Sequence, residues 1–183
     1  MAHNTTALPG FGAPAVGFDT PFEMLEACHE RMQRSLALLE KLCNYLHDHA
    51  CDDSARQAAQ DVLRYFDVAG PLHHQDEELH VFPIVLAQGA PGVVDRVRQL
   101  QHDHQHMDMH WRDARRRLLA LAQGQCNTFS AEDEATFALF SQGYAAHISC
   151  EEDVVYPAAR ALLSESVVQQ MGQEMRRRRG AAD

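Results

Sequence analysis

The chain contains one short motif twice, as HHQDE at residues 73–77 and as HISCE at residues 147–151. In each copy a histidine precedes a glutamate by four residues and a proline, Pro83 or Pro157, by ten. Residues four apart on an α-helix lie on the same face, one turn apart, so the histidine and the glutamate of each copy point in the same direction. The repeat therefore predicts two similar helices, each with a histidine–carboxylate pair.

A lone histidine precedes each pair at nearly the same distance. His29 lies 44 residues before the first pair and His104 lies 43 residues before the second, and both have a leucine four residues before and a methionine three residues after. Antiparallel helices of a bundle can bring such side chains to one level of the core. The predicted centre has four imidazoles and two carboxylates: His29, His73, Glu77, His104, His147 and Glu151.

This set of donors favours a dinuclear centre of a first-row transition metal over calcium or magnesium, because imidazole suits iron, zinc and copper and a carboxylate can bridge two ions. Two six-coordinate iron ions joined by an oxide or hydroxide would leave positions for solvent, O2 or peroxide. Asp108, four residues after His104 on the same helix face, is a possible extra metal ligand. Zinc or manganese can occupy similar ligands.

Other residues near the motifs leave alternatives open. A single histidine–glutamate pair on a helix is usually a surface ion pair, and only the duplication favours a metal site. His74 and Glu78 form a rival pair, but alignment on the two prolines favours His73 and Glu77. His80 has no counterpart in the second copy, where Val154 stands.

Further groups have a structural as well as a functional interpretation. His102, His106 and His110 are expected to face solvent. Cys28 and Cys150 precede predicted ligands and are either small buried apolar groups or redox groups. Arg176–Arg179 favours a solvated helix end, where positive charge suits the helix dipole.

Helix signals dominate the 183 residues. Thr20 and Glu23 form a predicted capping box at the start of a helix that runs to about residue 48, and Gly70-Pro71 is expected to break or kink the second helix. A third helix is expected over about 93–121, and Ser130 caps a fourth that continues to about residue 163. The fold class is all-α, an antiparallel up-down-up-down four-helix bundle (19–163) after a Gly/Pro-rich arm (1–18), with a short C-terminal helix and basic tail (164–183).

Composition limits the function classes. The net charge of −10 argues against broad nucleic-acid binding, and no apolar run approaches the roughly 20 residues that span a bilayer. Residues 1–18 lack the features of a secretory signal. Five cysteines without a C-x-x-C motif fit a reducing cytoplasm. No motif identifies a protein partner.

These motifs resemble the hemerythrin-like, HHE cation-binding family over about residues 18–163. The resemblance rests on the segments around His29 and His104 and on the two repeats, each with its aromatic-proline pair at 82–83 or 156–157. It implies a four-helix bundle around a non-haem di-iron centre with an oxygen bridge and two carboxylate bridges. Members bind O2, sense O2, redox state or NO, or hold iron.

The sequence departs from the oxygen carriers of that family at two places. Where they have a fifth histidine this chain has Asp108, and their last carboxylate corresponds to Glu152 rather than Glu151. This argues against simple O2 carriage. The leading hypothesis is a di-iron protein that reacts with O2, peroxide or NO as sensor, scavenger or iron handler. The alternatives are a di-iron peroxidase or oxidase, and a structural or regulatory module with an inert metal.

Overall fold

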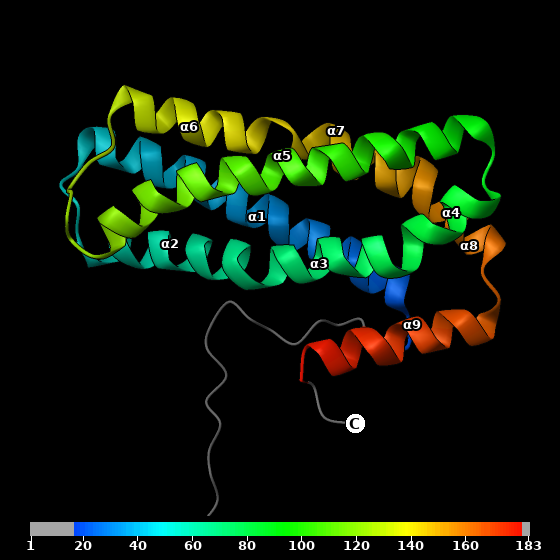
Figure 1. Cartoon of the computed structure of the whole chain (residues 1–183). Coiled ribbons are helices and arrows are strands. Elements are labelled where there is room, and N and C mark those ends of the chain that lie inside the picture. The colour runs from blue at the N-terminus through cyan, green and yellow to red at the C-terminus, as the bar shows by residue number, and fades with distance from the viewer. Residues whose placement is uncertain (1–16, 181–183) are drawn as a thin grey trace, which may run out of the picture.

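The computed structural model describes residues 17–180, and this part of the chain is helical without any strand (Figure 1). The first and third helical runs are the uninterrupted helices α1 (Pro21–Asp48) and α5 (Pro91–Ala122). The second run comprises α2 (Asp53–Arg64), η1 (Tyr65–Ala69), α3 (Gly70–Asp76), η2 (Glu77–Val81) and α4 (Phe82–Gln88). The fourth run comprises α6 (Ala131–Gln142), α7 (Tyr144–Cys150), η3 (Glu151–Val155) and α8 (Tyr156–Leu162), and α9 (Glu165–Arg178) follows. The predicted arm over 1–18 lies outside the described residues except for Gly17 and Phe18.

The predicted helix starts are correct in position, but one predicted cap is wrong. Asp52 accepts a hydrogen bond from the Ala55 amide at the start of α2, and Ser130 forms a complete capping box with Asp133 at the start of α6. Thr20 precedes α1 but makes no side-chain cap, because its hydroxyl donates to the Gly17 carbonyl instead, at 3.4 Å. The capping box expected at Thr20 is therefore absent.

Three π-helical turns each end two residues before a proline. The first of them, η1, lies where a break or kink was expected at Gly70-Pro71. The helix does not break there, because the Gly70 amide donates to the Tyr65 carbonyl and the helix continues. Proline has no amide hydrogen and its ring crowds the carbonyl four residues before it, and a wider turn relieves both problems. The other two turns, η2 and η3, begin at Glu77 and Glu151 and precede the two repeated prolines.

The core consists of two apolar clusters with a polar layer between them. Along α1, Leu25 belongs to one cluster and Met32 to the other, and the buried His29 lies between them. Along α5, Leu100 and Met107 flank the buried His104 in the same way. The repeated leucine and methionine therefore belong to opposite sides of the layer. Within residues 17–180, no helix has the length and apolar character to cross a membrane.

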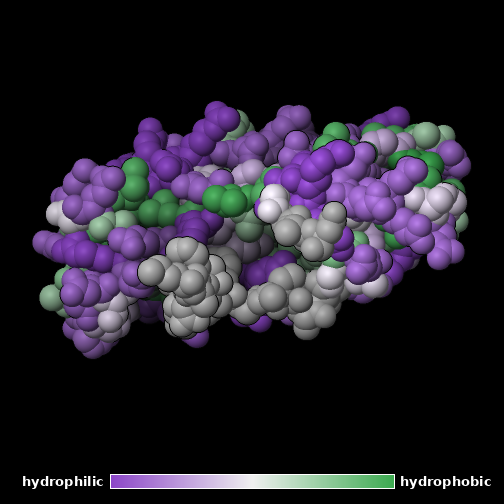
Figure 2. Space-filling model, turned by 90° about the horizontal axis from the view of Figure 1, so that it is seen from below, coloured by the Kyte–Doolittle hydropathy of each residue, from purple (hydrophilic) through white to green (hydrophobic). Residues whose placement is uncertain are grey.

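Helix α9 packs against the start of α1 rather than extending into solvent (Figure 1). Its Met171 and Met175 are buried in the same apolar cluster as Leu25. Between them, Gly172 lies so close to the segment that precedes α1 that a Cβ atom there would come within 2.0 Å of the Phe18 carbonyl oxygen. Figure 2 shows that the face seen from below is mainly hydrophilic, with hydrophobic residues in small patches.

Candidate metal centre

Four side chains from three helical runs form a first group of possible metal ligands. His29 of α1, His73 of α3, Glu77 of η2 and Glu151 of η3 each place one ligand atom within 4.8 Å of the others. All four residues are at most 1% exposed. The Nε2 atoms of His29 and His73 lie 2.9 Å apart. These are four of the six side chains that the sequence repeat selects.

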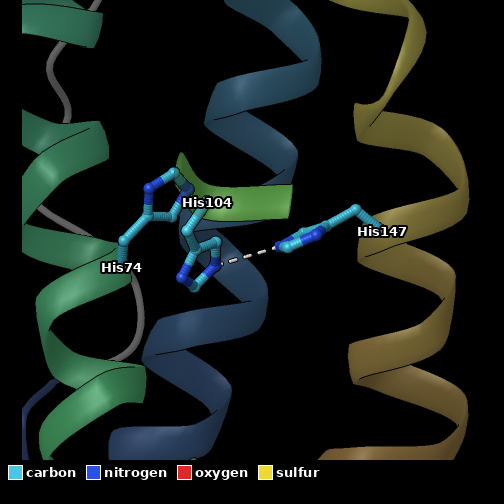
Figure 3. Close-up of side chains that lie close together, drawn as sticks. All are labelled: His74, His104 and His147. Atoms are coloured by element: carbon cyan, nitrogen blue, oxygen red, sulfur yellow. Dashed lines mark hydrogen bonds between the residues drawn. The ribbon is translucent and has the colours of Figure 1, made fainter. Parts of the chain in front are cut away.

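The other two selected histidines form a second group together with His74 (Figure 3). The Nε2 atoms of His104 and His147 are 3.1 Å apart, and the His74 ring lies nearly parallel to the His104 ring, with centroids 4.0 Å apart. Successive residues on an α-helix point about 100° apart, so His73 and His74 turn toward different groups. The sequence treated them as rivals, and the structure brings both to the centre.

The two carboxylates lie between the histidine groups. Glu77 directs Oε1 toward His73 Nε2, at 3.4 Å, and Oε2 toward His104 Nε2, at 3.5 Å. Glu151 directs Oε2 toward His29 Nε2, at 3.1 Å, and Oε1 toward His147 Nε2, at 3.0 Å. Each carboxylate therefore offers one oxygen to each group, which is the arrangement required to bridge two ions.

A second glutamate in each repeat contacts the lone histidine of the other repeat. Glu152 Oε1 lies 2.8 Å from His29 Nδ1, and Glu78 Oε1 lies 3.1 Å from His104 Nδ1. A carboxylate at Nδ1 favours the tautomer that donates from Nδ1 and leaves the Nε2 lone pair free for a metal. In both histidines Nε2 faces the centre. Each half of the chain thus supplies the carboxylate that orients the lone histidine of the other half, and we call Glu78 and Glu152 the crossed glutamates.

Comparison with known proteins agrees with this geometry. Residues 20–159 match the family model for the hemerythrin HHE cation-binding domain. The chain belongs to this family. An uncharacterized protein of Haemophilus influenzae is 33% identical over 162 residues, which cover 88% of this chain and 91% of that protein.

Electrostatics in this HHE domain keep several donors neutral without a cation. Burial, and then the neighbouring imidazoles, lower the pKa of His73 and of His74 well below the ordinary value, so both retain a free lone pair. Burial and the adjacent Glu151 charge raise the pKa of Glu77 well above its ordinary value. For Glu151, burial acts in the same direction, but the nearby imidazoles of His104, His147 and His29 lower its pKa well below the ordinary value. The centre is therefore built around a buried negative charge.

Buried atoms without hydrogen-bond partners show that the HHE residues fit a metal. Glu77 Oε2, both carboxylate oxygens of Glu151 and His74 Nε2 are buried and accept no hydrogen bond. Leaving such acceptors unpaired in a protein core costs free energy, and a cation between them would remove that cost. Imidazole and carboxylate together suit first-row transition metals.

The remaining candidates from the sequence belong to neither group of possible metal ligands. Asp108 is exposed and belongs to neither group of possible ligands, so the structure does not bring it to the place that His74 reaches. His102 and His106 are exposed on α5, with rings near each other. His80 Nε2 lies 2.8 Å from Arg178 Nη2. Cys28 is buried, and Arg31 donates to its sulfur at 3.0 Å.

Proposed function

We propose that the protein is a di-iron member of the hemerythrin HHE family that reacts with O2, peroxide or NO in the cytoplasm, as a sensor, scavenger or iron handler. The four longer helical runs would form the antiparallel up-down-up-down bundle of this family, with α9 added outside it. Five unpaired cysteines fit a reducing compartment.

The observation that carries this proposal is the position of the two carboxylates. Glu77 and Glu151 each direct one oxygen to the first group and the other to the second. A single mononuclear site would not need both oxygens of both carboxylates in this orientation. His29 and His73 would hold the first ion, and His74, His104 and His147 would hold the second.

The burial of the centre favours small reactants. The six side chains selected from the sequence are at most 5% exposed, so a bulky substrate could not reach them without rearrangement of the helices. Bound ferrous ions would supply the electrons for reduction of O2 or peroxide and a binding position for NO. The protein contributes fixed donors, two neutral imidazoles next to each other on α3, and a surrounding of apolar side chains that excludes water.

Two measurements test the proposal: metal analysis of the purified protein, and the visible spectrum of the reduced protein before and after exposure to O2. We expect two iron ions per chain and a visible charge-transfer spectrum that appears after O2, peroxide or NO is added. A single burst of reaction supports a sensor or scavenger, whereas sustained peroxide consumption with an added reductant supports a peroxidase. Iron that is bound yet unreactive supports a structural module.

Matched variants separate a buried centre from adventitious surface binding. His73→Ala removes a donor of the first group and should lower the iron content, whereas His102→Ala removes an exposed histidine and should leave it unchanged. Chelation should lower the melting temperature, because the buried acceptors lose their cation. An unchanged melting temperature after complete iron removal would contradict the buried centre.

A further inference from the structure

Tyr156 is a fully buried residue that contacts the first group of possible ligands. Its ring lies almost parallel to the His29 ring, at an interplanar angle of 6° and a centroid distance of 5.7 Å. Its hydroxyl donates a short hydrogen bond to Glu77 Oε1 and lies 3.4 Å from His29 Nε2. The phenol oxygen is thus directed into the centre, at the start of α8.

The corresponding residue of the other repeat has no hydroxyl. Phe82 follows η2 as Tyr156 follows η3, and each residue precedes one of the repeated prolines. The Phe82 ring lies against the His104 ring, at 22° and a centroid distance of 5.5 Å, as Tyr156 lies against His29. The two halves therefore hold an aromatic ring in the same place, and only the first group gains an oxygen from it.

The histidines are also distributed unevenly between the two groups, and the group with more histidines is the one without the phenol oxygen. His74 adds a third imidazole to the second group, whereas the matching residue of the second repeat is Ile148, which belongs to an apolar cluster. The first group therefore has two imidazoles and the second has three. The phenol oxygen lies on the side that lacks the third nitrogen.

Distances around His29 Nε2 place the phenol oxygen among the donors. His73 Nε2 lies at 2.9 Å, Glu151 Oε2 at 3.1 Å and Tyr156 Oη at 3.4 Å. Neighbouring donors at right angles around an ion with bonds of about 2.1 Å are roughly 3 Å apart. At 3.4 Å from His29 Nε2, the Tyr156 oxygen lies a few tenths of an ångström beyond this spacing and needs only a small shift to bind the same ion.

We propose that the Tyr156 oxygen is a phenolate ligand of the ion held by His29 and His73, an inference that rests on the proposed di-iron function. When the ferric ion binds, the O–H bond breaks, an oxygen–iron bond forms and the proton leaves to solvent, without electron transfer. If an added one-electron reductant converted this ion to the ferrous state, the oxygen–iron bond would break and the oxygen would take a proton back from solvent. The tyrosine would thereby occupy a coordination position of the first ion in its oxidised state and leave that position open to O2 or NO in its reduced state.

The test is resonance Raman spectroscopy of the iron-loaded, oxidised protein, together with its iron content. We expect a visible charge-transfer band that enhances tyrosine ring modes, and these modes should shift when the protein is produced with ring-deuterated tyrosine. Tyr156→Phe should lose the modes while keeping two iron ions, because a phenylalanine already fills the equivalent place at Phe82. Tyr144→Phe is the control, since Tyr144 is also buried but packs with Phe66 and Phe140.

The outcomes separate the two proposals. Wild-type protein that binds two iron ions without tyrosine modes overturns the phenolate assignment and leaves the di-iron function standing. Modes that persist in Tyr156→Phe, or that disappear in Tyr144→Phe, assign a different tyrosine and also overturn it. Wild-type protein that binds no iron rejects the di-iron function and the phenolate with it. The isotope shift in the wild-type protein decides whether any tyrosine is bound even if Tyr156→Phe fails to fold.

Discussion

Arg179 Nη2 lies 2.6 Å from Asp76 Oδ2, although the two residues are 103 positions apart in the chain. The other oxygen of Asp76 lies 2.6 Å from Arg178 Nη2. Asp76 is fully buried and directly precedes Glu77. The basic run was expected to be a solvated helix end, and for these two arginines that expectation is wrong, because α9 turns them toward a buried carboxylate.

Removal of both arginines should destabilise the fold. We expect Arg178→Ala/Arg179→Ala to lower the free energy of unfolding by about 3–5 kcal/mol, because it leaves the Asp76 charge buried without its partners. Urea unfolding measures the change. Arg177→Ala is the control, since this side chain is 77% exposed and 4.0 Å from Glu174, and its removal should have almost no effect. Equal stability of the double variant and the control would contradict the role of the ion pairs.

His74 should hold the second ion, and Asp108 should not contribute. His74→Ala is expected to weaken binding of the second ion and lower the iron content below two ions per chain, because that group loses one of its three imidazoles while the first group keeps His29 and His73. Asp108→Ala should keep both ions, since Asp108 is exposed. Metal analysis after gel filtration distinguishes the two. Loss of iron in Asp108→Ala with full loading of His74→Ala would reverse the assignment.

The crossed glutamates should tune metal affinity without binding metal themselves. Glu152→Gln and Glu78→Gln should each weaken iron binding by about 10–100-fold, because the imidazole they orient loses its carboxylate partner. Competition with a coloured chelator measures this. Asp153→Asn is the matched control, since Asp153 neighbours Glu152 but accepts a hydrogen bond from the Ser149 hydroxyl at 2.8 Å. Wild-type affinity in both glutamine variants would refute the orienting role.

Metal binding should release protons near neutral pH. Burial alone would lower the pKa of His29 and of His104, but the nearby carboxylates of Glu151 and of the crossed glutamates raise both pKa values above that of an ordinary histidine. Such a histidine stabilises the metal-free fold below pH 6.5, and this contribution is lost as the pH rises through its folded pKa. The gain in melting temperature on adding metal should therefore increase with pH. A pH indicator in weak buffer detects the released protons, and a gain in melting temperature that is largest in acid would contradict the prediction.

The sequence predicted the helical class and the meeting of six polar side chains because both depend on local periodicity. Spacing of four residues determines a helix face, and the duplication indicated which faces matter. The same reliance on symmetry concealed His74, because its counterpart is Ile148 and a repeat cannot reveal what only one copy contains. The exposed position of Asp108 also could not be read from its helix face alone.

Contacts between distant segments could not be predicted from local patterns. Nothing near Arg178 or Arg179 identifies Asp76, 102 and 103 positions away, as their partner. At Gly70-Pro71 the sequence predicted an irregularity at the right place but did not show that the helix would widen by one π turn instead of breaking. At Thr20 the local signal was correct for a cap, yet the hydroxyl found the Gly17 carbonyl instead.

The crossed contacts of Glu78 and Glu152 have a consequence for the origin of the chain. Neither half can orient its own lone histidine, because the carboxylate that does so belongs to the other half. A half-length ancestor with the same motif could have aligned that imidazole only by pairing with a second copy of itself. His74 and Tyr156 are the places where the two halves differ at the centre.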